Sequence, residues 1–173
     1  MNQLLHRFTG QADQLLAYHE ITEDLEITET VEHGLQEIPL DAIVGSVGRA
    51  EDFTREFLPK RDSDVERWAR VRSAVTDMQG WAPIDVYKLG DAYFVIDGNH
   101  RVSVARRLGN ETIAAHVVEV KTRLPLDGEA DPADFISRVN YVKFLETTGL
   151  DISQPTADLY LTFNDQYASL LRQ

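Results

Sequence analysis

The stretch from Asp97 to Arg101, Asp-Gly-Asn-His-Arg, contains several residue types that bind anions, namely glycine, histidine and arginine. It follows an apolar run, Tyr93 to Ile96, whose aromatic and β-branched residues predict a buried strand. The residues after it have helical spacing, and Gly109 is a typical helix stop. A strand that feeds a helix through a glycine aims unpaired backbone N–H groups at one point, because the first helical turn has no internal partners for them. We therefore expect a phosphate-binding corner made by Gly98, Asn99, His100 and Arg101.

A plainer interpretation of the same pattern stays open. Asp97 would simply N-cap the helix, and the side chains of His100 and Arg101 would be solvated. In either case we expect the helix to bury one side and to carry its arginines elsewhere, with two of them in the last turn, where they suit the helix dipole. The expected inward residues are Val102, Ala105 and Leu108, and the arginines are Arg101, Arg106 and Arg107.

A second glycine-containing loop, Gly45 to Arg49, precedes the corner in the chain. Ser46, Gly48 and Arg49 would contact another part of an anionic ligand. The alternative is an ordinary turn, since the loop lacks the Gly-Lys-Ser/Thr ending of a Walker motif.

The composition limits the class of protein. A chain of 173 residues with 43% apolar and 27% charged residues is typical of one globular domain, with room for a helical appendage. No apolar run is long enough to cross a bilayer, and no secretory signal is visible, so we expect a cytoplasmic protein with no membrane partner. The absence of cysteine excludes disulfides, thiolate metal sites and a cysteine nucleophile.

The charge distribution favours a small anionic ligand over nucleic acid. The formal net charge is −12, which opposes non-specific binding to a polyanion. Residues 49–107 are nearly neutral, with eleven Lys/Arg against ten Asp/Glu, whereas the flanks carry six against nineteen. A phosphate is therefore tolerable at the corner, and a long polyanion would have to pass the acidic flanks.

Periodicity predicts the remaining elements. We expect amphipathic helices at 2–19, 62–79 and 133–148, and a short helix at 50–60 with Phe53, Phe57 and Leu58 inward. Strands are expected at 34–44, 84–89 and 112–120, and residues 157–173 are expected to be partly strand-like before a helical end. The acidic segment 20–33 alternates like an exposed edge strand or arm, and its carboxylates are better explained as a solvated face than as a metal site.

Together these elements predict an α+β fold, a small mixed sheet with flanking helices. We expect an N-terminal helix and acidic arm over 1–33, a core over 34–122 and a C-terminal helical extension over 131–173. Because the last apolar segment has no helix cap, the chain is expected to come from a longer protein. The N-terminal helix would pack on its own core or on a second subunit of a homodimer.

The ordered pattern IPLDAIV, a long helix, PIDVYKL, and AYFVIDGNHRVSVARRLGNETIAAHVVEV resembles the ParB/sulfiredoxin superfamily over about residues 34–120. The resemblance implies a small α/β core whose Gly-x-x-Arg corner holds nucleotide phosphates: CTP in ParB partition proteins, ATP in sulfiredoxins, and adenine nucleotides in free-serine kinases. Gly98 matches the glycine, Arg101 the phosphate-binding arginine and His100 the histidine before it. The implied ligand is ATP, ADP or CTP, with Mg²⁺ bridging its phosphates.

Differences between this sequence and the family pattern distinguish it from some branches of the superfamily. Sulfiredoxins carry their reactive cysteine where this chain has Asn99, so reduction of sulfinic acid is excluded. ParB partition proteins read Gly-Glu-Arg-Arg, followed by a helix-turn-helix that residues 131–173 do not resemble. The corner is most similar to the Asp-Gly-His-His-Arg of the serine kinases.

Two functions therefore remain open. An enzyme would transfer a phosphoryl group from a nucleotide to a small acceptor or to water, with Asp97, Glu51 or Asp52 as base or metal ligand and Arg49 and Arg101 on the phosphates. A binding module would sense a nucleotide without chemistry, as a regulatory or DNA-associated ParB-like domain. A nuclease is the least favoured interpretation, because the flanks are acidic.

Overall fold

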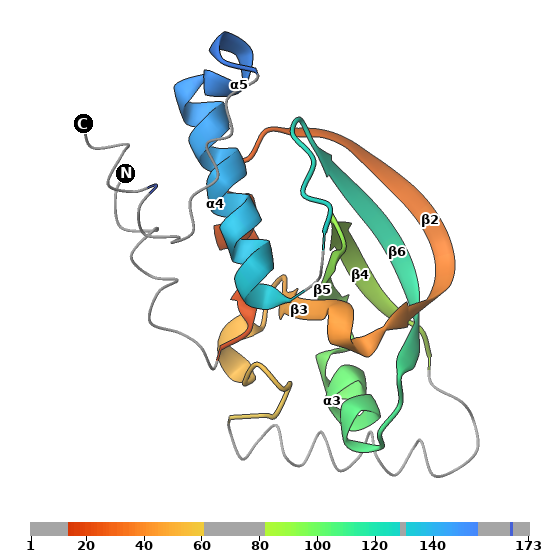
Figure 1. Cartoon of the computed structure of the whole chain (residues 1–173). Helices are drawn as coiled ribbons and strands as arrows, with labels where there is room; N and C mark the ends of the chain where they lie inside the picture. The colour runs from red at the N-terminus through yellow and green to blue at the C-terminus, as the bar shows by residue number, and fades with distance from the viewer. Residues whose placement is uncertain (1–13, 61–81, 129–130, 156–166, 168–173) are drawn as a thin grey trace.

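The computed structural model describes residues 14–60, 82–128, 131–155 and Tyr167. Within these residues one six-stranded mixed sheet has the strand order β1-β3-β5-β4-β6-β2 (Figure 1). Neighbouring strands are antiparallel in the pairs β2–β6 and β4–β5, and parallel in the other three pairs. The strands are β1 (Leu16–Ala17), β2 (Ile27–Pro39), β3 (Ile43–Ser46), β4 (Ile84–Leu89), β5 (Ala92–Asp97) and β6 (Thr112–Thr122). The helices are α1 (Tyr18–Thr22), α3 (Asn99–Arg107), α4 (Pro132–Thr148) and α5 (Leu150–Ser153), with 3₁₀ turns η2 (Leu40–Ala42) and η3 (Ala50–Asp52).

The two faces of the sheet bury separate clusters. Along β5, Val95 belongs to the cluster that contains Val102 and Ala105 of α3, whereas Phe94 belongs to the cluster that contains Phe135 of α4. Successive residues of a strand point to opposite faces, so the two helices cover opposite sides of the sheet. Figure 1 shows α4 along one side of the sheet and α3 at one end.

The predicted α+β class, with a small mixed sheet and flanking helices, is confirmed. The strands predicted at 84–89 and 112–120 and the helix predicted at 133–148 are present as β4, β6 and α4, each within two residues of its expected ends. Helix α4 begins where Asp131 caps it, by accepting from Ala133 N at 2.9 Å and Asp134 N at 3.3 Å. It ends at Gly149 in the left-handed conformation.

Other predictions in the N-terminal half were wrong in detail. Leu16–Ala17 is a strand where a helix was expected, and residues 18–22 form a short helix. The segment 34–44 is divided between two strands by η2, which begins directly after Pro39. The exposed edge strand predicted within 20–33 is confirmed as part of β2, which lies at the edge of the sheet, but β2 continues to Pro39 as one strand paired with β6. Gly45 and Ser46 lie in β3 and not in a loop, and a Cβ on Gly45 would stand 2.3 Å from Leu16 O.

The short helix predicted at 50–60 is reduced to the single turn η3. The hydroxyl oxygen of Thr54 accepts from Leu58 N at 3.1 Å, and Phe57 has a positive φ of 60°. Such a local side-chain bond competes with helical hydrogen bonds. Phe53 and Phe57 are nevertheless fully buried, as expected, and Leu58 is half-buried.

Two predicted segments, 62–79 and residues 2–13 of the N-terminal helix, lie outside the described residues, as does 157–173 apart from the buried Tyr167. Leu108 was expected to face inward but is 55% exposed, because the helix ends at Arg107 and the chain turns away there.

Candidate functional site

The corner begins with a glycine that no other residue can replace without strain. Gly98 caps α3 with φ 112° and ψ 17°, and a Cβ at this position would lie 2.4 Å from Ile84 Cγ2. Asp97 is the last residue of β5 and makes no capping bond, so the interpretation of Asp97 as the N-cap is wrong. The first turn of α3 contains no acidic residue and receives no side-chain cap. Its N–H groups therefore keep the capacity to bind an anion.

The side chain of Arg101 is held by hydrogen bonds near the start of α3 and is not simply solvated. Its Nη1 donates to Ala82 O at 2.8 Å and to Pro83 O at 2.5 Å, and its Nη2 donates to the carboxylate of Asp97. The Arg101 side chain is 20% exposed, whereas that of Asp97 is 68% exposed. The guanidinium thus joins the end of β5 to the segment that enters β4.

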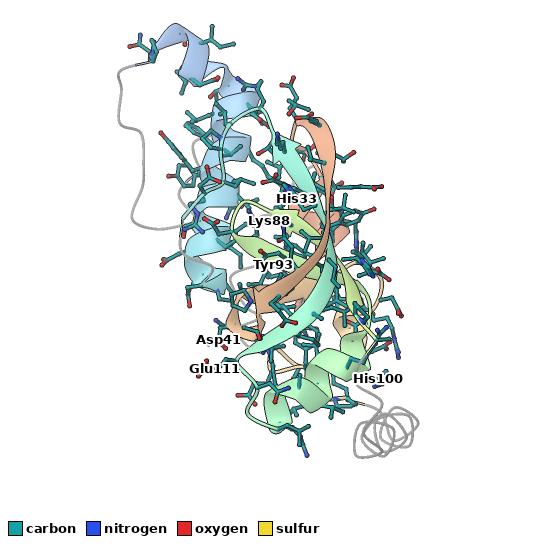
Figure 2. All side chains as sticks on the ribbon, turned by 90° about the vertical axis from the view of Figure 1, so that its right-hand side faces the viewer. His33, Asp41, Lys88, Tyr93, His100 and Glu111 are labelled. Atoms are coloured by element: carbon teal, nitrogen blue, oxygen red, sulfur yellow. The ribbon has the colours of Figure 1, made fainter. Side chains whose placement is uncertain are left out.

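His100 is buried, at 6% exposure, and contacts the loop after β3. Its Nε2 lies 3.1 Å from Nη1 of Arg49, and its ring meets the edge of Phe53 with centroids 5.1 Å apart. A guanidinium only donates hydrogen bonds, so Nε2 of His100 is the acceptor in this contact. In Figure 2 His100 lies at the start of α3, well separated from His33, Lys88 and Tyr93 further along the sheet.

Arg49 brings the second predicted loop to the corner. Its backbone N donates to the hydroxyl of Ser46 at 3.3 Å, its Nε donates to Asp52 Oδ2 at 2.8 Å, and its guanidinium lies 5.4 Å from the centre of the Phe53 ring. Phe53 therefore contacts both Arg49 and His100. The sequence marked Phe53 only as an apolar core residue, because its contacts with Arg49 and His100 depend on the tertiary fold.

One pocket collects most of the predicted residues. It has a volume of about 260 Å³ and is lined by Arg49, Ile96, Asp97, Gly98, Asn99, His100 and Arg101. A second pocket, of about 460 Å³, shares Arg49 and includes Gly48, Glu51, Asp52, His19 and Glu20 in its lining. We call these the corner pocket and the side pocket.

The remaining predicted residues lie outside the corner pocket. Ser46 is fully buried and donates to Val95 O at 3.2 Å, so its hydroxyl fixes the loop. Gly48 and Glu51 are exposed and line the side pocket, not the corner pocket. Asp52 also lines the side pocket, where it pairs with Arg49. Among the residues that the structure describes, no three His, Asp or Glu side chains are grouped so that they could hold a metal.

The far end of α3 is fixed by Arg106. Its Nη2 donates to Leu40 O at 2.8 Å and to Ile43 O at 2.9 Å, and the guanidinium stands 5.0 Å from the centre of the Phe57 ring. Burial lowers the pKa of Arg106, an effect that Asp41 and Glu56 oppose. Helix α3 is thus tied through Arg106 to the segment that precedes the loop carrying Arg49, and through His100 to Arg49 itself.

Comparison with known proteins places the chain in a family. The profile of the ParB N-terminal domain matches residues 26–127, and the chain belongs to that family. A solved structure of sulfiredoxin from Arabidopsis thaliana aligns with 22% sequence identity and a TM-score of 0.36, covering 48% of this chain and 82% of that one. No curated protein sequence matches the chain. None of the helices in the described part is long and apolar enough to cross a membrane.

Proposed function

We propose that this domain binds a nucleotide through its phosphates in the corner pocket. The observation that carries the proposal is the meeting of the glycine-capped start of α3 with Arg49 and Arg101 in one pocket. Backbone N–H groups at a helix start and two arginines are the donors that phosphate oxygens require. The side pocket beyond Arg49 offers room for the sugar and base of ATP, ADP or CTP.

The carboxylates of Asp97 and Asp52 are the present partners of the two arginines. A bound phosphate would replace these carboxylates or share the guanidinium with them, since each guanidinium has five N–H donors. Because the carboxylates in reach are paired with arginines, the geometry favours a nucleotide-sensing module over an enzyme.

Asp97 supports phosphoryl transfer or nucleotide hydrolysis as a second candidate. It is the carboxylate of the corner pocket and is largely exposed, so an acceptor hydroxyl or a water beside the phosphate would be within its reach. Mg²⁺ would then come with the nucleotide. Asp97→Asn separates the two candidates: turnover in the parent protein that disappears in this variant, with binding retained, would identify an enzyme.

Calorimetric titration with ATP, ADP, CTP and GTP, each with and without Mg²⁺, tests the proposal. Arg101→Ala is expected to weaken the bound nucleotide about 10–100-fold, because a charge-assisted hydrogen bond is lost. Arg107→Ala is the matched control, since Arg107 lies on the same helix, is exposed and does not line the corner pocket. Failure of all four nucleotides to bind, or an equal loss in both variants, would overturn the proposal.

A further inference from the structure

The corner pocket contains one group that a simple anion site would not place there. Asn99, the first residue of α3, is only 5% exposed and lines the pocket. Its Oδ1 is buried, and no donor in the described part of the chain lies within hydrogen-bonding distance of it. A buried carbonyl oxygen without a donor is costly, so its retention at this place calls for an explanation.

The groups around Asn99 do not supply that donor. The side-chain bonds of Arg101 go to the carbonyls of residues 82 and 83 and to Asp97, and the nearby bonds of Arg49 go to Asp52 and His100. Asp97, the other acceptor side chain lining this pocket, is already engaged by Arg101. Oδ1 of Asn99 is therefore an acceptor of this pocket without a donor among the described residues, whereas the carboxylate of Asp97 is paired with Arg101.

An acceptor oxygen of the protein is repelled by the ionised oxygens of a bound anion. The contact becomes favourable when one oxygen of the anion carries a proton that it can donate. Phosphate at neutral pH always carries at least one proton, whereas sulfate, which has the same shape, carries none. The N–H groups of α3 and the arginines would bind the ionised oxygens, and Oδ1 of Asn99 would accept from the remaining O–H.

We propose that Asn99 is a specificity-determining residue that selects a protonated phosphate group over fully ionised oxyanions of the same size. This inference rests on the proposed function, and it adds that the terminal phosphate of the bound nucleotide carries a proton. Because that group ionises near neutral pH, binding without Mg²⁺ takes up a proton and weakens as the pH rises.

Titration of ¹⁵N-labelled protein with inorganic phosphate and with sulfate at pH 7 tests the inference, with the amide signals of residues 99–101 as the readout. The parent protein is expected to prefer phosphate about tenfold. Asn99→Leu, which has a similar shape but no acceptor, is expected to bring the ratio of the two affinities close to one. Arg101→Ala is the control and is expected to weaken both anions alike.

A second variant keeps the test decisive if Asn99→Leu does not fold. Asn99→Asp retains an acceptor and adds a charge, so both anions weaken, sulfate more than phosphate, and the ratio stays at or above its parent value. An equal affinity of the parent protein for phosphate and sulfate, or a ratio that falls to one in Asn99→Asp, would overturn the role of Asn99 and leave nucleotide binding intact. Binding of neither anion, together with no nucleotide binding, would overturn the proposed function itself.

Discussion

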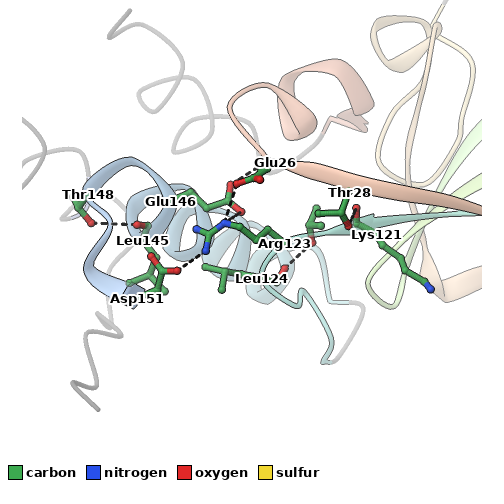
Figure 3. Close-up of polar contacts among 10 residues, drawn as sticks. Glu26, Thr28, Lys121, Arg123, Leu124, Leu145, Glu146, Thr148 and Asp151 are labelled. Atoms are coloured by element: carbon green, nitrogen blue, oxygen red, sulfur yellow. Dashed lines mark hydrogen bonds and ion pairs between the residues drawn. The ribbon is translucent and has the colours of Figure 1, made fainter. Parts of the chain in front are cut away.

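Two regions of the molecule are built around arginines that join distant segments, and they differ in the balance of charge. Arg123 Nε lies 2.9 Å from Glu26 and 3.8 Å from Glu146, and Nη1 donates to Asp151, so three carboxylates surround one guanidinium (Figure 3). This cluster, which we call the clasp, ties β2, β6, α4 and α5 together. At the corner, two arginines are paired with two carboxylates beside a helix start that no side chain caps.

The difference shows how one residue type serves two purposes. The clasp has an excess of negative charge and repels a further anion, so Arg123 can only hold the fold together. The corner has matched charges plus the partial positive charge of the helix start, so it retains a capacity for an anion. The number of carboxylates for each arginine separates a structural ion-pair cluster from a candidate binding site.

The largest expected effect on stability and binding comes from adding a methyl group at Gly98. Gly98→Ala places a Cβ against Ile84 at a positive φ, and we expect a loss of about 2–4 kcal/mol in the free energy of unfolding together with loss of nucleotide binding. Gly109→Ala is the matched control at the other end of α3, because φ is +75° there and nothing lies within 4 Å of the added atom. Urea denaturation that gives equal losses for both variants would contradict the packing at Ile84.

The next effect separates the two regions directly. Arg123→Ala removes the centre of the clasp, so we expect the Tm to fall by a few degrees while nucleotide affinity stays within about twofold of the parent value. Arg101→Ala is expected to change affinity by the larger factor given above. Scanning calorimetry and nucleotide titration of both variants check this, and a strong loss of affinity in Arg123→Ala would erase the distinction.

The smallest effect is the pH dependence of the clasp. The hydrogen bond from Arg123 lowers the pKa of Asp151 below its ordinary value. A carboxyl with a lowered pKa in the folded state stabilises the fold above its unfolded pKa and loses this contribution as the pH falls. Below about pH 4 the parent protein should therefore lose stability more steeply than Asp151→Asn, as measured by the Tm at each pH. Parallel curves would contradict the role of this ion pair.

The spacing of apolar residues was sufficient to predict the elements whose buried face follows from the local sequence. Strands β4, β5 and β6 and helices α3 and α4 follow from alternating or helical spacing and from glycine stops. The break at Pro39, the strand at Leu16 and the irregular chain around Thr54 were missed, because tertiary pairing and side-chain hydrogen bonds override local preference there.

The residue types of the candidate site were visible in the sequence, whereas the contacts between them were not. Glycine, histidine and arginine at Gly98, His100 and Arg101 carried the signal in the sequence. The contact of Arg49 with His100 joins residues 51 positions apart, and the bonds of Arg101 to residues 82 and 83 depend on sheet pairing. Ser46 resembled a phosphate ligand, but only the structure shows its hydroxyl turned to Val95.

The most direct test of the central claim is to locate a bound nucleotide by ¹⁵N chemical shifts. If the phosphates bind at the corner, the largest changes will be at the amides of residues 98–101 and of the Arg49 loop, and the amides of the clasp, residues 146–151, will stay unchanged. Changes centred on the clasp, or no change at the start of α3 while the nucleotide is bound, would contradict the account.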